Sequence, residues 1–231
     1  AILQIVRGEA YMKRSEANSY DSEPLFAERG VIYDRHQEEL AWNTLVEGDS
    51  VPHRVYRAGG FGQLLGYVSY PKRDSSGYFW QLEYEGKSGV EKLFQDTLAG
   101  INGATLARRD VSGDVATESS VVAPTPGQNV TLSIDARVQE QMYSSIKTLA
   151  DSAGYDGGAG IVLDIYTGEV IALVSYPEYD ATILSEGKDR DIIRGYARDH
   201  RKVYLNRAIS GLYTPGSIVK PFLALAALNE D

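Results

Sequence analysis

The sequence predicts an α+β protein in which a mostly β first part is followed by an antiparallel sheet covered by helices. Three observations predict this class. Glycine and proline interrupt residues 44–88 repeatedly, which is typical of short strands and loops. Residues 135–153 combine a capping aspartate with helical spacing of apolar side chains. Residues 158–177 place two apolar runs on either side of a turn, the pattern of a β-hairpin.

Composition excludes several classes of function. The chain has 231 residues, enough for one large or two small domains, and is 43% hydrophobic and 24% charged, as soluble globular proteins are. The absence of cysteine excludes disulfides, thiolate catalysis and Cys-ligated metal sites. The three histidines lack metal-binding spacing, so we expect no metal. A net charge of −9 argues against nucleic acid as a partner, because phosphate binding needs a basic face.

The first part of the chain reads as a series of short elements. Residues 1–20 predict a helix or extended segment ending before Pro24, and no apolar run in the chain reaches the ~18 residues that a membrane span needs. Residues 27–43 predict two strands joined by a turn. Residues 89–100 have helical spacing, with Gly100 as the residue that follows the helix.

A domain boundary is predicted near Gly127. Residues 110–128 show no helical period and close with two prolines and a glycine. The predicted domains are therefore residues 1–128 and residues 129–231. We expect the first of them to be self-contained.

The second part has more regular patterns. Asp135 predicts the cap of a helix that runs to Ala153, with Gly154 after it. The apolar face expected on this helix consists of Val138, Met142, Ile146 and Leu149.

Because both runs of the hairpin 158–177 are apolar at nearly every position, we expect the sheet to be covered on both faces. Residues 185–202 are densely charged and predict a solvated loop or surface helix, whereas residues 217–228 are apolar nearly all round and predict a buried helix.

The strongest chemical candidate is the pair Ser217 and Lys220. A serine nucleophile needs a base, and residues three apart on a helix share one face, so the Lys220 amine can approach the Ser217 hydroxyl. An apolar setting disfavours the ammonium form and would let a neutral Lys220 act as that base. The start of the helix adds backbone N–H groups suited to a developing oxyanion.

Spacing alone does not single out this pair, because Ser-x-x-Lys occurs four times. The other three are Ser69/Lys72, Ser144/Lys147 and Ser185/Lys188. Only Ser217 follows a Thr-Pro-Gly turn and starts an apolar helix, in which Lys220 is the one charged residue before Leu228. A structural role for Lys220 remains the alternative.

Other motifs favour structural explanations. Gly60, Gly62 and Gly66 hint at a phosphate-binding loop, but no strand–turn–helix unit surrounds them and residues 67–70 predict a strand. The charges in residues 29–35 predict salt bridges and turn hydrogen bonds that lock two strands. His36 and His53 have no partner pattern and are expected at the surface.

Around Ser217 the sequence resembles class B penicillin-binding proteins, the peptidoglycan D,D-transpeptidases. The family pattern there is Asn-Arg-Ala, an aromatic residue, Pro-Gly-Ser and Lys-Pro. The matching residues are Asn206, Arg207, Ala208, Tyr213, Pro215, Gly216, Ser217, Lys220 and Pro221. Residues 132–135 with Gln139, and residues 158–180, are similar to the start of the transpeptidase domain and its first hairpin. Residues 29–35, 65–68, 89–91 and 98–100 resemble the membrane-proximal pedestal domain, and residues 3–8 resemble those just after the family's membrane anchor.

Three departures from the family pattern limit what can be carried over. We expect residue 1 to lie just outside the membrane, after the family's anchor, and residues 43–65 are too short for the head subdomain of many members. The family's Ser-x-Asn and Lys-Thr/Ser-Gly motifs have no counterpart, so we expect the intact protein to continue beyond Asp231. The chain as given is therefore expected to be inactive alone and to leave part of its apolar core uncovered.

The resemblance implies a mechanism and a setting. Ser217 would attack the penultimate D-Ala carbonyl of a stem peptide, with Lys220 as base, and a neighbouring stem-peptide amine would then form the cross-link. β-Lactams would acylate Ser217, and no cofactor is implied. The implied partners are a membrane-embedded glycan polymerase and other cell-wall synthesis proteins. The implied location is the outer, periplasmic face of a bacterial cell membrane, on a single-pass anchor.

Two other classes of function stay open on the sequence alone. The chain could serve as a non-catalytic scaffold that binds cell-wall synthesis partners. It could also belong to a penicillin-sensing receptor, which shares Ser-x-x-Lys, although the pedestal motifs argue against this. Penicillin labelling separates enzyme from scaffold, and turnover on peptide substrate separates enzyme from sensor.

Overall fold

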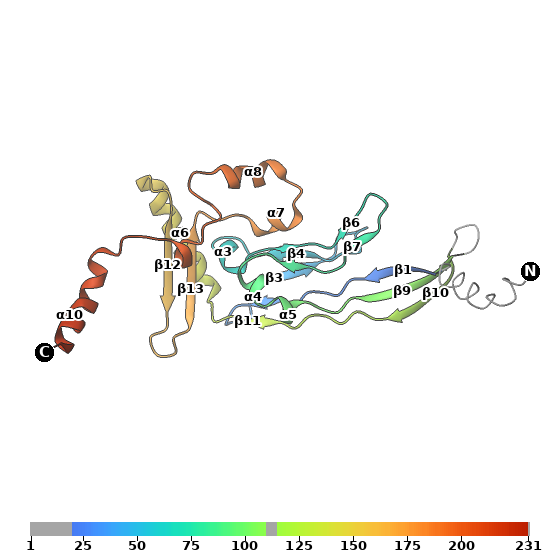
Figure 1. Cartoon of the computed structure of the whole chain (residues 1–231), viewed down its shortest axis with the longest axis horizontal. Helices are drawn as coiled ribbons and strands as arrows, with labels where there is room; N and C mark the ends of the chain where they lie inside the picture. Colours follow the sequence, from blue (N-terminus) through green and yellow to red (C-terminus); the bar gives the residue numbers. More distant parts are fainter. Residues whose placement is uncertain (1–19, 110–114, 231) are drawn as a thin grey trace, which may run out of the picture.

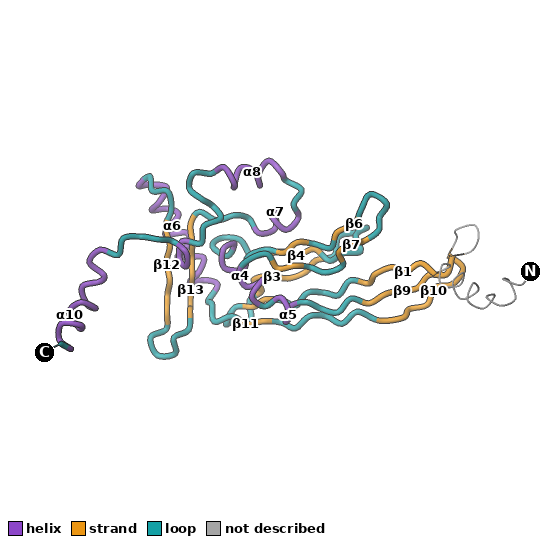
Figure 2. Tube along the Cα trace, viewed as in Figure 1, coloured by secondary structure: helices purple, strands orange, loops and turns teal. Residues whose placement is uncertain are grey.

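A computed structural model describes residues 20–109 and 115–230, and it confirms the α+β class. The molecule is elongated, with a β arm at one end and a hairpin with its helices at the other (Figure 1). Long loops connect the short strands between these ends (Figure 2). The entry segment predicted for residues 1–20 lies outside the described residues, apart from Tyr20.

The β arm is a three-stranded antiparallel sheet in the order β1-β9-β10. Its strands are β1 (Tyr20–Leu25), β9 (Gly103–Arg109) and β10 (Val115–Val122). Strand β10 lies in the stretch where the sequence showed no helical period. The pairing of β1 with β9 brings residues 20–25, where the described chain begins, beside residues 103–109.

Short strands and helices fill the region next to the arm, as the glycine and proline pattern predicted. A four-stranded sheet has the order β11-β2-β3-β4, with β11 parallel to β2 and the other pairs antiparallel. Its strands are β2 (Ile32–Tyr33), β3 (Glu39–Thr44), β4 (His53–Tyr56) and β11 (Val130–Thr131). Two small ladders pair β5 (Val68–Ser69) with β8 (Glu85–Gly86) and β6 (Lys72–Arg73) with β7 (Phe79–Gln81). The helix α3 (Gly62–Leu65) is a single turn.

The helix predicted over residues 89–100 is two short helices instead. They are α4 (Gly89–Leu93) and α5 (Gln95–Leu98), separated at Phe94. Helix α5 ends at Leu98 with Ala99 as its cap, so Gly100 occupies the predicted C′ position, but it does not adopt the left-handed conformation typical of that position. Gly100 instead permits close packing: an added Cβ would lie 2.5 Å from both the Ala27 side chain and the Thr125 carbonyl oxygen.

Helix α6 (Ala136–Ala153) matches its prediction at both ends. The Asp135 carboxylate accepts hydrogen bonds from the Arg137 and Val138 amides, which would otherwise lack partners in the first turn. At the other end, Gly154 adopts φ +73°, the left-handed conformation that commonly ends helices. The predicted apolar face is only partly covered, since Val138 is 36% and Leu149 61% exposed.

The predicted hairpin consists of β12 (Gly158–Leu163) and β13 (Val170–Tyr176), with α6 packed against both strands (Figure 1). Strand β13 buries Ala172, Val174 and Tyr176. Strand β12 leaves Leu163 56% exposed. The expectation of cover on both faces is therefore wrong for β12 within the described chain, where α6 supplies one layer.

The main hydrophobic core runs through both parts of the chain. Residues from the first part pack in one cluster with residues from the second. The cluster consists of Ile32, Leu40, Ala41, Tyr56, Phe61, Leu65, Val90, Leu98, Val130, Ile134, Ala136, Tyr179, Ala181 and Val203. The expectation of a self-contained first part is therefore wrong, because the apolar side chains that it buries pack partly against the second part.

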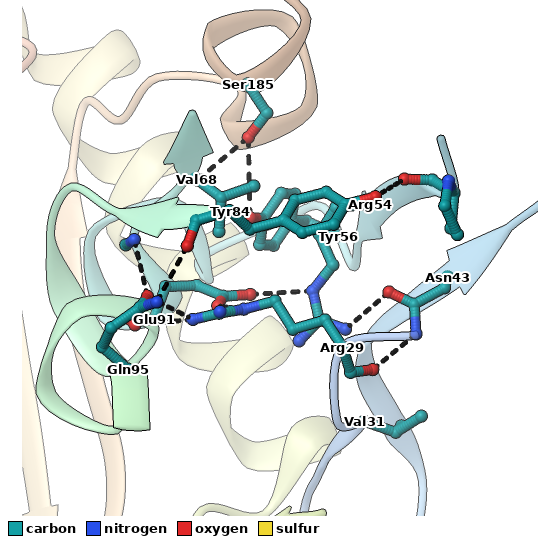
Figure 3. Close-up of polar contacts among 12 residues, drawn as sticks. Arg29, Val31, Asn43, Arg54, Tyr56, Val68, Tyr84, Glu91, Gln95 and Ser185 are labelled. Carbon is teal, nitrogen blue, oxygen red and sulfur yellow. Dashed lines mark hydrogen bonds and ion pairs between the residues drawn. The ribbon is translucent and has the colours of Figure 1, made fainter. Parts of the chain in front are cut away.

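A buried charge network joins strands β3 and β4 to helices α4 and α5 (Figure 3). The Glu91 carboxylate accepts from Arg29 Nε at 2.6 Å and from Arg54 Nε at 2.8 Å, and all three side chains are at most 1% exposed. Asn43 and Gln95 complete the network by bonding Arg54 and Arg29, respectively. Among the described residues, Arg29 Nη1 and Arg54 Nη2 find no hydrogen-bond partner. Two buried cations thus depend on one carboxylate.

The turn between β2 and β3 is held as the sequence predicted. The Asp34 carboxylate accepts from the His36 and Glu38 amides at 2.7 and 2.8 Å, and from the Ala136 amide at 3.1 Å. Arg35 pairs at 3.5 Å with Glu169, which directly precedes Val170 in the second part of the chain. These contacts are the turn hydrogen bonds and salt bridges expected for residues 29–35.

Helices α7 (Ala181–Glu186) and α8 (Arg190–Arg198) follow the hairpin. Helix α8 buries none of its residues, which confirms the surface helix predicted in residues 185–202. Ser185 is the exception in that stretch, since it is only 6% exposed.

Candidate functional site

The segment that carries Ser217 is anchored on strand β13. The Ser175 hydroxyl donates to the Leu205 carbonyl at 3.1 Å and accepts from the Arg207 amide at 2.9 Å. The Arg207 guanidinium is buried and donates to the backbone carbonyls of Arg201 and Lys202. Helix α9 (Arg207–Ser210) begins here, capped by the Asn206 side chain. Asn206 and Arg207 therefore fix the point from which the chain runs to Ser217.

Ser217 lies in the short 3-10 helix η1 (Gly216–Val219), directly after a tight turn. Gly216 adopts φ +57°, in the left-handed region that side chains with a Cβ rarely occupy. Pro215 before it has a restricted φ of its own. The Pro-Gly pair thus turns the chain so that Ser217 is delivered into the first turn of a helix.

Lys220 is the first residue of helix α10 (Lys220–Asn229), and Pro221 follows at a position where the helix needs no N–H donor. The Lys220 amide donates to the Ser217 carbonyl, so the two residues are joined through one helical turn. Both side chains are exposed, and no hydrogen bond joins them in the described part of the chain. The apolar surroundings expected for Lys220 are therefore not formed by these residues.

The helix predicted to be buried over residues 217–228 is exposed along its length. Helix α10 extends away from the rest of the molecule (Figure 1) and buries none of its residues. Its large apolar side chains Phe222, Leu223, Leu225 and Leu228 are 63–74% exposed. Since the sequence is apolar on all sides, the expectation followed correctly from hydropathy, but no described residue covers the helix.

The other three Ser-x-x-Lys sites have structural environments. Ser69 lies in β5, Ser144 is exposed on α6 with Lys147 tied to Asp151 at 2.6 Å, and Ser185 is buried. None of them follows a left-handed glycine turn into a helix, as Ser217 does.

The glycine-rich stretch 60–66 binds a carboxylate of its own chain. The amides of Gly60 and Gly62 donate to the Glu178 carboxylate at 2.7 and 2.8 Å. Burial raises the pKa of Glu178, although these two hydrogen bonds act against the shift. The backbone donors that could have held a phosphate are thus engaged, and no sequence pattern indicated Glu178 as their partner.

Neither metal ligation nor a membrane span is found in the described residues. No group of three His, Asp or Glu side chains there has an arrangement that could hold a metal ion. No described helix is both long and apolar enough to cross a bilayer.

Two protein families match this chain. The Penicillin-binding Protein dimerisation domain matches residues 45–132, and the Penicillin binding protein transpeptidase domain matches residues 158–231. Ser217 and Lys220 fall within the second match, whereas the buried network around Glu91 falls largely within the first.

Curated relatives include two enzymes of Escherichia coli strain K12. The peptidoglycan D,D-transpeptidase FtsI is 31% identical over 152 residues, which is 66% of this chain and 24% of FtsI. The peptidoglycan D,D-transpeptidase MrdA is 33% identical over 144 residues, which is 62% of this chain and 22% of MrdA. The matched part of the chain thus spans about a quarter of the length of these relatives.

Solved structures share the fold. The penicillin-binding protein PBP2 of Pseudomonas aeruginosa is similar with a TM-score of 0.68 and 28% identity, over 90% of this chain and 42% of that one. PBP2 of Helicobacter pylori, solved in a complex with MreC, has a TM-score of 0.68 at 22% identity, over 91% of this chain and 52% of that one. A peptidoglycan synthase complex contains a chain with a TM-score of 0.69 at 24% identity, over 99% of this chain and 51% of that one.

Proposed function

The chain belongs to the class B penicillin-binding proteins, and from that premise we propose that the whole protein is a peptidoglycan D,D-transpeptidase with Ser217 as its nucleophile. The observation that carries this proposal is the left-handed turn at Gly216, which places Ser217 in the first turn of a helix, followed by Lys220. No other Ser-x-x-Lys site in the described residues has this geometry.

The proposed reaction is two successive acyl transfers. The Ser217 hydroxyl oxygen attacks the penultimate D-Ala carbonyl of a stem peptide while its proton passes to the neutral Lys220 amine. The peptide C–N bond then breaks, and the terminal D-Ala leaves with that proton, so that an ester remains on Ser217. The amine of a second stem peptide attacks the ester and forms the cross-linking amide, the ester C–O bond breaks, and one proton of that amine regenerates the Ser217 hydroxyl.

Backbone groups support the charge that develops on the carbonyl oxygen. The Ser217 amide lies at the start of the η1–α10 helical segment, where unpaired N–H groups and the positive end of the helix dipole favour an anion. We propose that it is one of the two donors of the oxyanion hole. β-Lactams present a similar carbonyl and would acylate the same serine.

The setting of this activity is part of the proposal. The synthase complex and the MreC complex among the similar structures support cell-wall synthesis proteins as partners, including a membrane-embedded glycan polymerase. We place the protein on the outer face of the bacterial membrane through a single-pass anchor. We also propose a boundary between a pedestal of residues 1–128 and a transpeptidase part from residue 129 onward.

The function is tested with the full-length protein and a synthetic donor and acceptor stem peptide. A transpeptidase releases D-Ala, forms the cross-linked product and loses both activities in penicillin. A penicillin sensor would be acylated without turning over peptide, and a scaffold would do neither. Either of the last two outcomes would replace the proposal by the corresponding alternative.

When it is assayed by itself, the 231-residue chain should label with penicillin far more slowly than the full-length protein. Loss of one oxyanion donor typically costs about 10²–10³ in rate, and the described residues offer only the donor at Ser217. The exposed apolar face of α10 should also make the chain associate. Fluorescent-penicillin labelling and sedimentation measure both effects, and Phe222→Ser with Leu225→Ser should restore a monomer. A monomeric chain that labels as fast as the full-length protein would refute the expectation.

A further inference from the structure

The end of helix α7 forms a contact with the pedestal that no part of the proposed mechanism uses. Ser185 accepts the Val68 amide at 3.2 Å and donates to the Tyr56 hydroxyl at 3.5 Å, and its side chain points between these residues (Figure 3). Val68 lies in β5, but its amide bonds this hydroxyl. The next residue, Glu186, is the last residue of α7. Two consecutive residues of the transpeptidase part thus insert into the pedestal.

His53 lies between two carboxylates at this contact. Its Nε2 is 3.0 Å from Asp49 Oδ2, within the pedestal, and its Nδ1 is 3.8 Å from Glu186 Oε1, on α7. The His53 side chain is only 14% exposed, so the expectation of a surface histidine is wrong. The hydrogen bond with His53 lowers the pKa of Asp49 below its ordinary value.

The surroundings of His53 hold its ring in place. The ring lies 5.5 Å from that of Tyr70, whose hydroxyl bonds both the amide and the carbonyl of Arg54. Arg54 in turn belongs to the buried network of Glu91 (Figure 3). The imidazole is therefore packed against a rigid part of the pedestal, and it faces Glu186 across the junction.

Two cations complete the charges around this site. Arg73 and Lys188 line the same cavity of about 160 Å³ as His53, Asp49 and Glu186. Both have exposed side chains, and neither forms an ion pair with another described residue. Arg73 and Lys188 offset part of the negative charge of the two carboxylates. Glu186 therefore pairs with His53, but His53 is not the only source of positive charge near it.

We propose that His53, Asp49, Ser185 and Glu186 form a pH-sensitive latch between the pedestal and the transpeptidase part. An imidazolium has two N–H donors and can serve Asp49 and Glu186 together. A neutral imidazole has one N–H and turns a lone pair toward the other carboxylate. The latch is therefore closed while the His53 ring carries both N–H protons, and it loosens when the ring carries only one.

The Val68 amide provides a direct readout, because its hydrogen bond to Ser185 exists only while α7 is docked. In the full-length protein, its exchange protection factor should fall about twofold to fivefold between pH 5.5 and 8, the size expected for loss of a partly exposed ion pair. His53→Gln cannot titrate and should give a protection factor that is flat across this range. Glu186→Gln should lower protection at acidic pH to the basic-pH value.

His36→Gln is the matched control. His36 also pairs with an aspartate, Asp135, at 3.1 Å, but its hydrogen bonds go to Asp34 and Asp135 and not to α7, so the variant should leave the pH profile of Val68 unchanged. The Ser185→Ala variant shows that the readout reports the contact, because it should remove Val68 protection at every pH. A wild-type profile that is flat, or a profile that His53→Gln does not alter, would overturn the proposal.

Discussion

Replacing Lys220 with methionine is expected to lower the rate of penicillin acylation of the full-length protein by about 10²–10⁴-fold, the usual cost of losing a general base. Methionine keeps the length and apolar character of the stem and removes the amine. Because Lys220 is exposed and forms no side-chain hydrogen bond among the described residues, its loss should leave the thermal midpoint about unchanged. Where the whole protein buries the cation, stability should rise instead.

Stopped-flow labelling with a fluorescent penicillin measures this effect, and calorimetry measures the thermal midpoint. Lys147→Met is the matched control, since Lys147 also follows a serine by three residues but pairs with Asp151 on the surface of α6. It should acylate at the wild-type rate. Normal acylation by Lys220→Met would show that Lys220 is a structural residue.

Removing the Glu91 carboxylate should cause the largest loss of stability in the pedestal. Glu91→Ala leaves Arg29 and Arg54 buried without their shared counter-charge, and breaking a buried ion pair on one side typically costs about 3–5 kcal/mol. Arg29 Nη1 and Arg54 Nη2 already lack hydrogen-bond partners among the described residues. No spare acceptor is therefore at hand to replace the lost carboxylate. Glu91→Gln keeps one acceptor and the side-chain volume, and it should lose less than the alanine variant.

Urea unfolding of the full-length protein measures these free energies. The control is Glu38→Gln, which breaks a half-exposed pair with Arg57 and should cost at most about 1 kcal/mol. If Glu91→Ala were as stable as this control, the network would contribute no more than a surface ion pair. That result would contradict the assigned role of the buried carboxylate.

Local signals predicted the elements of the second part well. Asp135 and Gly154 fixed both ends of α6 because capping depends on residues next to the helix. The hairpin was equally clear, since its turn and both apolar runs are contiguous. The break at Phe94 and the fit of Gly100 were missed because both depend on packing against distant backbone.

Contacts between distant residues account for most of what the sequence could not predict. Glu91 lies 62 residues from Arg29 and 37 from Arg54, so no spacing pattern links them. Glu178 lies 118 residues from Gly60, and the glycines alone looked like a weak phosphate loop. His53 looked like a surface residue because one of its two partners, Glu186, belongs to the other part of the chain.

The turn and helix that carry Ser217 were predictable because their signal is local. The left-handed Gly216 and the helix after it follow from a short contiguous motif. The cover of that helix was not predictable in the same way: hydropathy indicated burial, and the described residues leave α10 open to solvent.

The claim that Ser217 is the nucleophile is tested most directly by mapping the penicillin adduct on the full-length protein by peptide mass spectrometry. The proposal predicts one adduct, on the peptide that contains Ser217, and its complete loss in Ser217→Ala. Ser144→Ala, an exposed serine of the same spacing, should keep the adduct. An adduct on Ser69, Ser144 or Ser185 that survives Ser217→Ala would contradict the account.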